Sequence, residues 1–386
     1  MAGFIPLSVP NFAGREKEYV NEAVVSEWVS TGGSKVSEFE AALARYVGMP
    51  RAVACNSGTS GLHLACLAAG VGAGCEVIVP TLTFIAAVNP VRYAGAEPVF
   101  IGCDDSLCMD AAAAEAFCAN ECRMEQGRLV NKTTGAHVKA LLVVHVFGNM
   151  ADMPAFMALG QKYGLAIIED ATEALGTRYT SGPYAGKMAG TIGDVGVYSF
   201  NGNKIITTGA GGMLVSNHAD WAEHAKHLST QAKADELQFF HDEVGYNYRL
   251  TNLQAALGLA QLEQLEGFIA HKHALWDTYK AQLDGKNGYR ILGFREECTR
   301  PNKWFISLYL QDERHDRDAV IAALKAQGIQ TRPVWALIHE QADYGKNQVF
   351  GAEKARDYRA KIVNLPCSTN LSMADCQRVI DALLAL

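Results

Sequence analysis

The sequence lacks the features that mark several classes of protein. Its ten cysteines include no C-x-x-C pair and no zinc-ligand spacing, so they predict reduced, mostly structural thiols. No run of about 18 apolar residues is present, which argues against a membrane-spanning helix. The first residues do not follow the pattern of a signal peptide, and we expect a cytoplasmic protein.

Strong positive charge is also missing. The formal net charge is −7, and no basic run or basic amphipathic helix occurs. These properties argue against nucleic acid and against an anionic membrane surface as partners. A polyanionic ligand would therefore have to be bound by a few local groups.

What the sequence does contain is material for a large core. The chain has 386 residues, of which 49% are hydrophobic and 19% are charged. A chain of this length and composition supports two packed units. We expect a larger unit over residues 1–254 and a smaller one over residues 255–386, in continuous packing because no Pro/Ser-rich linker separates them.

Apolar strand-like runs alternate with helix-like segments between residues 50 and 216. This alternation predicts an α/β fold with a mostly parallel sheet wrapped by helices. The expected strands are residues 52–55, 76–79, 98–101, 140–144, 165–169, 194–200 and 212–216. The carboxyl-terminal part has the pattern of an α+β unit. We expect a long helical stretch at residues 252–283, a strand at residues 304–310, and helices at residues 317–327 and 374–384.

Lys204 is the most informative residue of the chain. It lies on a turn after the expected strand 194–200 and before the glycine-rich segment 207–212. Asp170 follows a second buried strand. Together they are the minimum that pyridoxal phosphate requires, because the lysine forms a Schiff base while the carboxylate keeps the pyridine nitrogen protonated and the ring electron-withdrawing.

A phosphate site is expected near Lys204. Residues 57–60 form a turn that leads into an apolar helix, and such a helix start offers backbone N–H groups, hydroxyls and a favourable dipole. Taken alone, this segment would be an ordinary helix cap. Ser199, five residues before Lys204, is close enough to bind the same phosphate.

Two further side chains fit the same cofactor. Phe84 could stack on the pyridine ring, although by itself it would be a core phenylalanine at a helix start. Glu173, three residues after Asp170, could reach the phenolic oxygen of the cofactor or the substrate, although exposed glutamates are common. The order of all these parts along the chain is that of a fold-type I pyridoxal phosphate enzyme.

The histidines give no sign of a metal centre. His63, His145 and His339 do not have metal-ligand spacing, so we expect no metal site. His63 on its apolar helix and His145 near a strand end are expected to be structural.

Longer motifs extend the pattern over nearly the whole chain. They are residues 28–33, 56–62, 80–84, 145–148, 169–171, 198–204, 207–209, 245–251 and 331–333. With these motifs the chain resembles the DegT/DnrJ/EryC1/StrS family of sugar-nucleotide aminotransferases. The serine-phenylalanine-x3-lysine motif and the glycine-tyrosine-asparagine motif are specific to that family.

The resemblance implies a fold-type I pyridoxal phosphate-dependent transferase with a large domain and a smaller carboxyl-terminal domain. It implies Lys204 as the Schiff-base lysine and Asp170 as the partner of the pyridinium. Cofactor contacts are further implied for Gly58, Thr59, Ser60, Phe84, Glu173 and Ser199.

The resemblance also implies a homodimer with shared active sites. Asn247 would reach the phosphate of the cofactor in the neighbouring subunit. The cleft for the nucleotide sugar would be lined by Ser30, Thr31, Gly32, Arg332 and Trp335.

The implied reaction is an amino transfer to a sugar. L-glutamate would donate the amino group, and C4 of a nucleotide-linked 4-keto-6-deoxy sugar would accept that group. Lys204 would move a proton in both half-reactions. Residues 169–176 and 331–335 look most like the branch that aminates UDP-4-keto-6-deoxy-N-acetylglucosamine for legionaminic acid and bacillosamine synthesis, and so for surface glycans. The alternative is a GDP-4-keto-6-deoxymannose 4-aminotransferase, a perosamine synthase.

Two more distant alternatives are a sugar C3 dehydratase and a cofactor-binding regulator without turnover. Dehydratases on this scaffold replace the lysine with histidine, so Lys204 argues against the first. The intact set of Lys204, Asp170 and Ser199 argues against the second. Ala210 stands where relatives often carry glutamate or glycine, and Glu173 replaces the glutamine of many members. We expect both departures to tune substrate preference.

Overall fold

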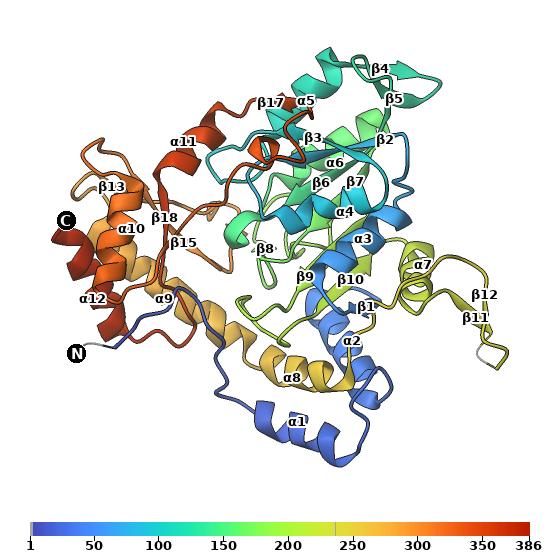
Figure 1. Cartoon of the computed structure of the whole chain (residues 1–386), viewed down its shortest axis with the longest axis horizontal. Coiled ribbons are helices and arrows are strands. Elements are labelled where there is room, and N and C mark those ends of the chain that lie inside the picture. Colours follow the sequence, from blue (N-terminus) through green and yellow to red (C-terminus); the bar gives the residue numbers. More distant parts are fainter. Residues whose placement is uncertain (1–2, 236) are drawn as a thin grey trace.

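The centre of the protein is a ten-stranded sheet (Figure 1). The computed structural model describes residues 3–235 and 237–386. Across the sheet the strands are β1 (Ala52–Cys55), β10 (Gly212–Ser216), β9 (Val195–Ser199), β7 (Ala166–Asp170), β6 (His137–Val144), β2 (Cys75–Pro80), β3 (Glu97–Ile101) and β17 (Val349–Phe350). Among these eight strands, neighbours are parallel except at β10, which runs antiparallel to both β1 and β9. The predicted α/β fold with a mostly parallel sheet is confirmed.

All seven strands expected between residues 50 and 216 are present in this sheet. The other three strands of this sheet were not predicted. β4 (Cys122–Glu125) and β5 (Arg128–Asn131) form a hairpin beside β6, and β17 joins β3 from far along the chain. Each is short and lies at a margin of the sheet, where little apolar periodicity is required.

Helices pack against the sheet and against one another. They are α1 (Glu16–Val25), α2 (Ser34–Val47), α3 (Gly58–Ala68), α4 (Asn89–Tyr93), α5 (Ala111–Asn120), α6 (Met153–Tyr163) and α7 (Ala219–Ser229). α3 packs on β9 and β10, and α6 packs on β6 and β7. The predicted cap of α3 is confirmed, because the Ser57 hydroxyl oxygen accepts the N–H of Ser60 at 3.0 Å.

The long helical stretch expected over residues 252–283 is present, but it consists of two helices. α8 (Asn252–Leu262) and α9 (Leu265–Leu283) are separated at Glu263 and Gln264. At the break, the side-chain amides of Gln261 and Gln264 both donate to the buried Glu16 carboxylate. The two helices also have different partners, since α8 packs on α1 and α2 while α9 packs on the carboxyl-terminal elements.

A second, four-stranded antiparallel sheet lies in the carboxyl-terminal part. Its order is β13 (Tyr289–Ile291), β15 (Ile306–Leu310), β18 (Ile362–Leu365) and β16 (Arg332–Pro333). Around it lie α10 (Arg317–Ala326), α11 (Glu353–Lys361) and α12 (Met373–Leu384). Gly3 lies beside α12, because its carbonyl oxygen accepts a hydrogen bond from the Arg378 guanidinium at 3.2 Å, and the carboxyl end of the chain directly follows α12 (Figure 1). The expected division between residues 254 and 255 falls inside α8 and stays a prediction.

The remaining elements are small. They are β8 (Arg178–Tyr179) paired with β14 (Thr299–Arg300), the hairpin of β11 (Lys233–Asp235) and β12 (Phe240–His241), and 3-10 turns at Ile85–Ala87, Val146–Gly148 and Ile338–Glu340. Within residues 3–235 and 237–386, no helix has the length and apolar character needed to cross a membrane.

Candidate active site

A cavity of about 340 Å³ opens where the carboxyl ends of β7 and β9 meet the N-terminus of α3. Ligands of open α/β sheets bind at the carboxyl ends of the strands. Of the residues predicted from the sequence, the cavity brings together Gly58, Thr59, Phe84, Asp170, Glu173, Ser199, Lys204 and Trp335. Ala210 lines it as well.

The start of α3 approaches Ser199 so closely that a side chain is excluded at Gly58. A Cβ atom there would lie 2.8 Å from Ser199 Cβ and 3.0 Å from Thr172 Cγ2. The first N–H groups of a helix have no partner inside it. The Ser57 hydroxyl oxygen accepts the N–H of Ser60. Gly58 and Thr59 both lie on the cavity wall, and among the described residues their N–H groups have no hydrogen-bond acceptor, so they are available to a ligand.

Asp170 ends β7 at the bottom of this region and is 4% exposed. The N–H of Thr172 donates to its Oδ1 atom at 3.0 Å, which fixes the carboxylate. Burial raises the pKa of Asp170 above its ordinary value, while hydrogen bonds from Thr172 and the charge of Lys204 act in the other direction. A cationic partner would favour the ionised form of this carboxyl group.

Lys204 and Glu173 meet inside the cavity. The Lys204 Nζ atom lies 3.4 Å from Glu173 Oε1, and the two side chains are 13% and 4% exposed. The backbone N–H of Phe147 donates to Glu173 Oε2 at 2.8 Å. Burial raises the pKa of Glu173 to about 7, although Lys204 opposes this rise.

Aromatic rings form another wall of the cavity. Trp335 lies 6.4 Å from Phe84 and 4.7 Å from Phe147 between ring centres, and Trp304 stacks on Phe305 at 4.0 Å. Phe84 is 53% exposed, so about half of its side chain is not covered by the protein. Taken in isolation, Phe84 was expected to be a core residue. The structure shows that it is not buried.

Trp304 was missed by the sequence analysis. Its ring centre lies 4.2 Å from Lys204 Nζ, and its indole N–H donates to the carbonyl oxygen of Asn203 at 2.8 Å. The buried Lys272 on α9 donates from Nζ to the carbonyl oxygens of Trp304, at 2.8 Å, and of Cys367. No local signal marks Trp304, because it precedes β15 and reaches the cavity only through tertiary packing.

Several predicted residues do not line the cavity. The Ser60 hydroxyl instead donates to Asn56 Oδ1 at 2.6 Å. Asn247 is exposed, and its backbone forms an isolated antiparallel β-bridge with Thr230. The others outside the cavity wall are Ser30, Thr31, Gly32 and Arg332.

Behind Asp170 lies a buried histidine-glutamate pair. His145 Nε2 donates to Glu169 Oε2 at 2.8 Å, because its Nδ1 atom accepts the N–H of Ala151 and therefore carries no proton. Glu169 also accepts the backbone N–H groups of Gly190, Ile192 and Gly193. The predicted structural role of His145 agrees with these contacts, which tie the end of β6 to the loop before β9.

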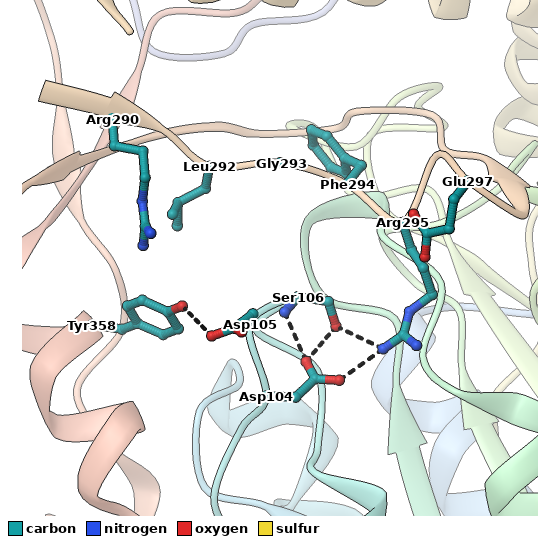
Figure 2. Close-up of a pocket in the computed structure, with 10 residues that line it drawn as sticks. All are labelled: Asp104, Asp105, Ser106, Arg290, Leu292, Gly293, Phe294, Arg295, Glu297 and Tyr358. Atoms are coloured by element: carbon teal, nitrogen blue, oxygen red, sulfur yellow. Dashed lines mark hydrogen bonds and ion pairs between the residues drawn. The ribbon is translucent and has the colours of Figure 1, made fainter. Parts of the chain in front are cut away.

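A second cavity, of about 490 Å³, lies apart from the predicted residues (Figure 2). Its acidic and basic groups pair with one another. Arg295 binds Asp104 at 2.7 Å, and Tyr358 donates to Asp105 at 3.2 Å. Arg290 projects into this cavity, but its charge lies near those of Asp105 and Asp357. With charges compensated in this way, it does not compete with the Lys204 cavity as the candidate active site.

Comparison with known proteins identifies the class. A sequence profile of the DegT/DnrJ/EryC1/StrS aminotransferase family matches residues 10–384. The GDP-perosamine synthase of Caulobacter vibrioides is 38% identical over 382 residues, which cover 98% of this chain and 97% of that protein. The GDP-perosamine synthase of Escherichia coli O157:H7 is 37% identical over 369 residues, which cover 96% and 94%.

Solved structures share the fold. The aminotransferase TlmJ from Streptoalloteichus hindustanus superimposes with a TM-score of 0.88 at 27% identity, over 99% of this chain and 98% of that one. The architecture is thus that of the fold-type I pyridoxal phosphate-dependent transferases. The chain belongs to the DegT/DnrJ/EryC1/StrS aminotransferase family, and it is a pyridoxal phosphate-dependent sugar aminotransferase.

The cavity fits this cofactor. A primary amine, a buried carboxyl group and a helix start stand around one space, and the Ser199 hydroxyl lies on its wall beside the start of α3, where a phosphate needs donors.

Proposed function

We propose that the protein transfers the amino group of L-glutamate to C4 of a nucleotide-linked 4-keto-6-deoxy sugar. The observation that carries this proposal is the position of Lys204. Its amine stands in the cavity together with Asp170 and the open start of α3. These three features supply an attachment point, a partner for a ring nitrogen and a phosphate site.

In this proposal Gly58, Thr59 and Ser199 hold the phosphate, and Asp170 binds the pyridine nitrogen. The exposed part of Phe84 packs on the ring. Lys204 would hold the cofactor in the resting enzyme. When the amino acid takes the place of the lysine, the cofactor would supply an electron sink that makes the α-C–H bond acidic, and the Lys204 amine is then free.

Lys204 is the proton carrier of the proposed reaction. Its Nζ atom takes the proton from the α-carbon of glutamate and delivers it to C4′ of the cofactor, and the same atom works in reverse when the sugar is aminated. The aromatic wall of Trp304, Phe305 and Trp335 excludes water from this region.

The proposed active unit is a homodimer. Exposed apolar side chains support it, because Leu237, Phe239, Phe240 and Val244 are 89%, 73%, 60% and 82% exposed in the single chain. Asn247, which follows this segment, would then reach the phosphate in the neighbouring subunit. The sugar cleft would involve Ser30, Thr31, Gly32, Arg332 and Trp335.

The identity of the nucleotide separates two candidate substrates. The sequence motifs favoured UDP-4-keto-6-deoxy-N-acetylglucosamine. Both sequence relatives described above are named GDP-perosamine synthase, which supports the alternative, GDP-4-keto-6-deoxymannose. We therefore place the GDP sugar first and retain the UDP sugar as the second candidate.

A two-step absorption experiment tests the reaction and the substrate. L-glutamate should bleach the band of the loaded enzyme near roughly 410 nm, and the keto sugar that accepts the amine should restore it. Recovery with the GDP sugar alone supports a perosamine-type enzyme, and recovery with the UDP sugar alone supports the second candidate. No formation of 2-oxoglutarate would contradict catalysis and favour a regulator.

A lysine variant tests the attachment point. Lys204→Ala should lose the band and all transamination while still binding the cofactor through the phosphate site. The exposed Lys187 offers a matched control, and Lys187→Ala should behave like the wild type. Transamination by Lys204→Ala would show that the role given to Lys204 is wrong.

A further inference from the structure

The amine of Lys204 stands between two side chains, and this position suggests how its proton is managed. Nζ lies 3.4 Å from Glu173 Oε1 and 4.2 Å from the centre of the Trp304 ring. An acid on one side and a π face on the other both favour a cation at this point.

Both partners of the amine are fixed. Glu173 Oε2 accepts the Phe147 N–H at 2.8 Å, which leaves Oε1 directed to Lys204. Trp304 is held through its indole N–H by Asn203 and through its carbonyl by Lys272. Both partners are therefore positioned by other contacts, and the Lys204 amine lies within reach of Glu173 Oε1.

The charged groups that face Glu173 are Lys204, on the turn after β9, and Asp170, at the end of β7. His145, whose charge would act on Asp170, lies behind it, where its ring nitrogens bond Glu169 and the N–H of Ala151. With a pKa of about 7, Glu173 can both accept and release a proton near neutral pH.

We propose that Glu173 is the proton partner of Lys204: its carboxylate takes a proton from the lysine ammonium when the amine attacks a carbonyl, and returns it when the amine is released. The Trp304 ring holds Nζ within reach. In the forward step one Nζ–H bond breaks and one Oε1–H bond forms, so the pair keeps its single proton and no other reactant is needed. This inference rests on the proposed attachment of the cofactor at Lys204.

The pair makes the reactive amine available over a range of pH. While the two groups share one proton, the fraction present as neutral amine and carboxylic acid does not depend on pH. A lysine without such a partner behaves differently, because its neutral fraction rises about tenfold per pH unit below its pKa.

The test follows cofactor loading by the full chain after its cofactor has been removed. The rate at which added pyridoxal phosphate attaches is measured against pH for the wild type and for Glu173→Gln. Titration of the free cofactor affects both proteins equally and cancels in the ratio of the two rates. Above a pH of about 7, where Glu173 has lost its own proton, the wild-type advantage should fall by about tenfold for each pH unit gained, since in that range only the variant depends on pH to free its amine.

The chain contains a matched control. Lys303 lies 3.5 Å from the centre of the Trp276 ring and 2.8 Å from Glu296, outside the cavity. Glu296→Gln alters an equivalent lysine-tryptophan-glutamate trio and should leave the loading profile unchanged. Glu173→Asp keeps an acid and should restore the wild-type shape of the profile at a lower rate.

A rate ratio that is constant with pH would overturn the proposal, because a purely structural Glu173 changes loading equally at every pH. If Glu173→Gln does not fold, the wild type is compared with Nα-acetyl-lysine reacting with the same cofactor. Equal pH slopes for protein and free lysine would then overturn it. Attachment that persists in Lys204→Ala would instead refute the proposed function, so the two failures are distinguishable.

Discussion

Burial raises the pKa of the Glu173 carboxyl from 4.5 to about 7, and this change links stability to pH. In that interval the folded protein binds a proton more tightly than the unfolded chain does. The free energy of unfolding of the wild type, relative to Glu173→Gln, should therefore fall as the pH rises from about 4.5 to about 7 and stay constant above it. Urea unfolding of the cofactor-free proteins measures this difference, and parallel stability curves would contradict it.

Single residues could be predicted where their position follows from local pattern. Lys204, Asp170 and Ser199 lie at or just beyond strand ends, and apolar runs mark those ends in the sequence. Trp304 and Phe147 could not be found in this way. Trp304 reaches the cavity from a segment about 100 residues downstream of Lys204. Phe147 packs against the wall residue Trp335 from a turn with a positive φ. Neither position has a periodic signal.

At the scale of elements, the docking of α3 on β9 decides how well the phosphate site forms. Gly58→Ala would place a Cβ atom 2.8 Å from Ser199 Cβ, so the helix start must move away from Ser199. We expect weaker cofactor binding, on the order of tenfold or about 1.4 kcal/mol. Equilibrium dialysis of pyridoxal phosphate against the cofactor-free protein measures the change.

The control for this variant is Gly72→Ala, since no atom of residues 3–235 and 237–386 lies within 4 Å of a Cβ placed at Gly72. It should bind the cofactor as the wild type does. Equal affinity for Gly58→Ala and Gly72→Ala would show that the close contact between α3 and Ser199 is not needed.

The separation of α8 from α9 shows what a sequence pattern leaves out at this scale. Apolar residues continue at helical spacing across the break, so periodicity alone predicts one helix. The break depends on Glu16, a residue far away in the chain whose buried carboxylate binds Gln261 and Gln264. Tertiary hydrogen bonds of this kind have no local sequence signal.

At the scale of the whole molecule, the proposed dimer predicts that two inactive variants restore each other. Lys204→Ala and Asn247→Ala should each have low activity alone. A mixed dimer contains one site with both residues intact, and random reassortment should give about a quarter of the wild-type sites. Activity after mixing, with the molecular mass from light scattering, tests this expectation; a monomeric mass or no recovery would contradict the shared site.

The tryptophan content of the cavity has an optical consequence. Two of the five tryptophans, Trp304 and Trp335, line it. Indole emission overlaps the absorption of the attached cofactor, and energy transfer between them is efficient at such short range. The intrinsic tryptophan fluorescence should therefore be strong when the cavity is empty and quenched when the cofactor is bound, so it reports occupancy without an added dye.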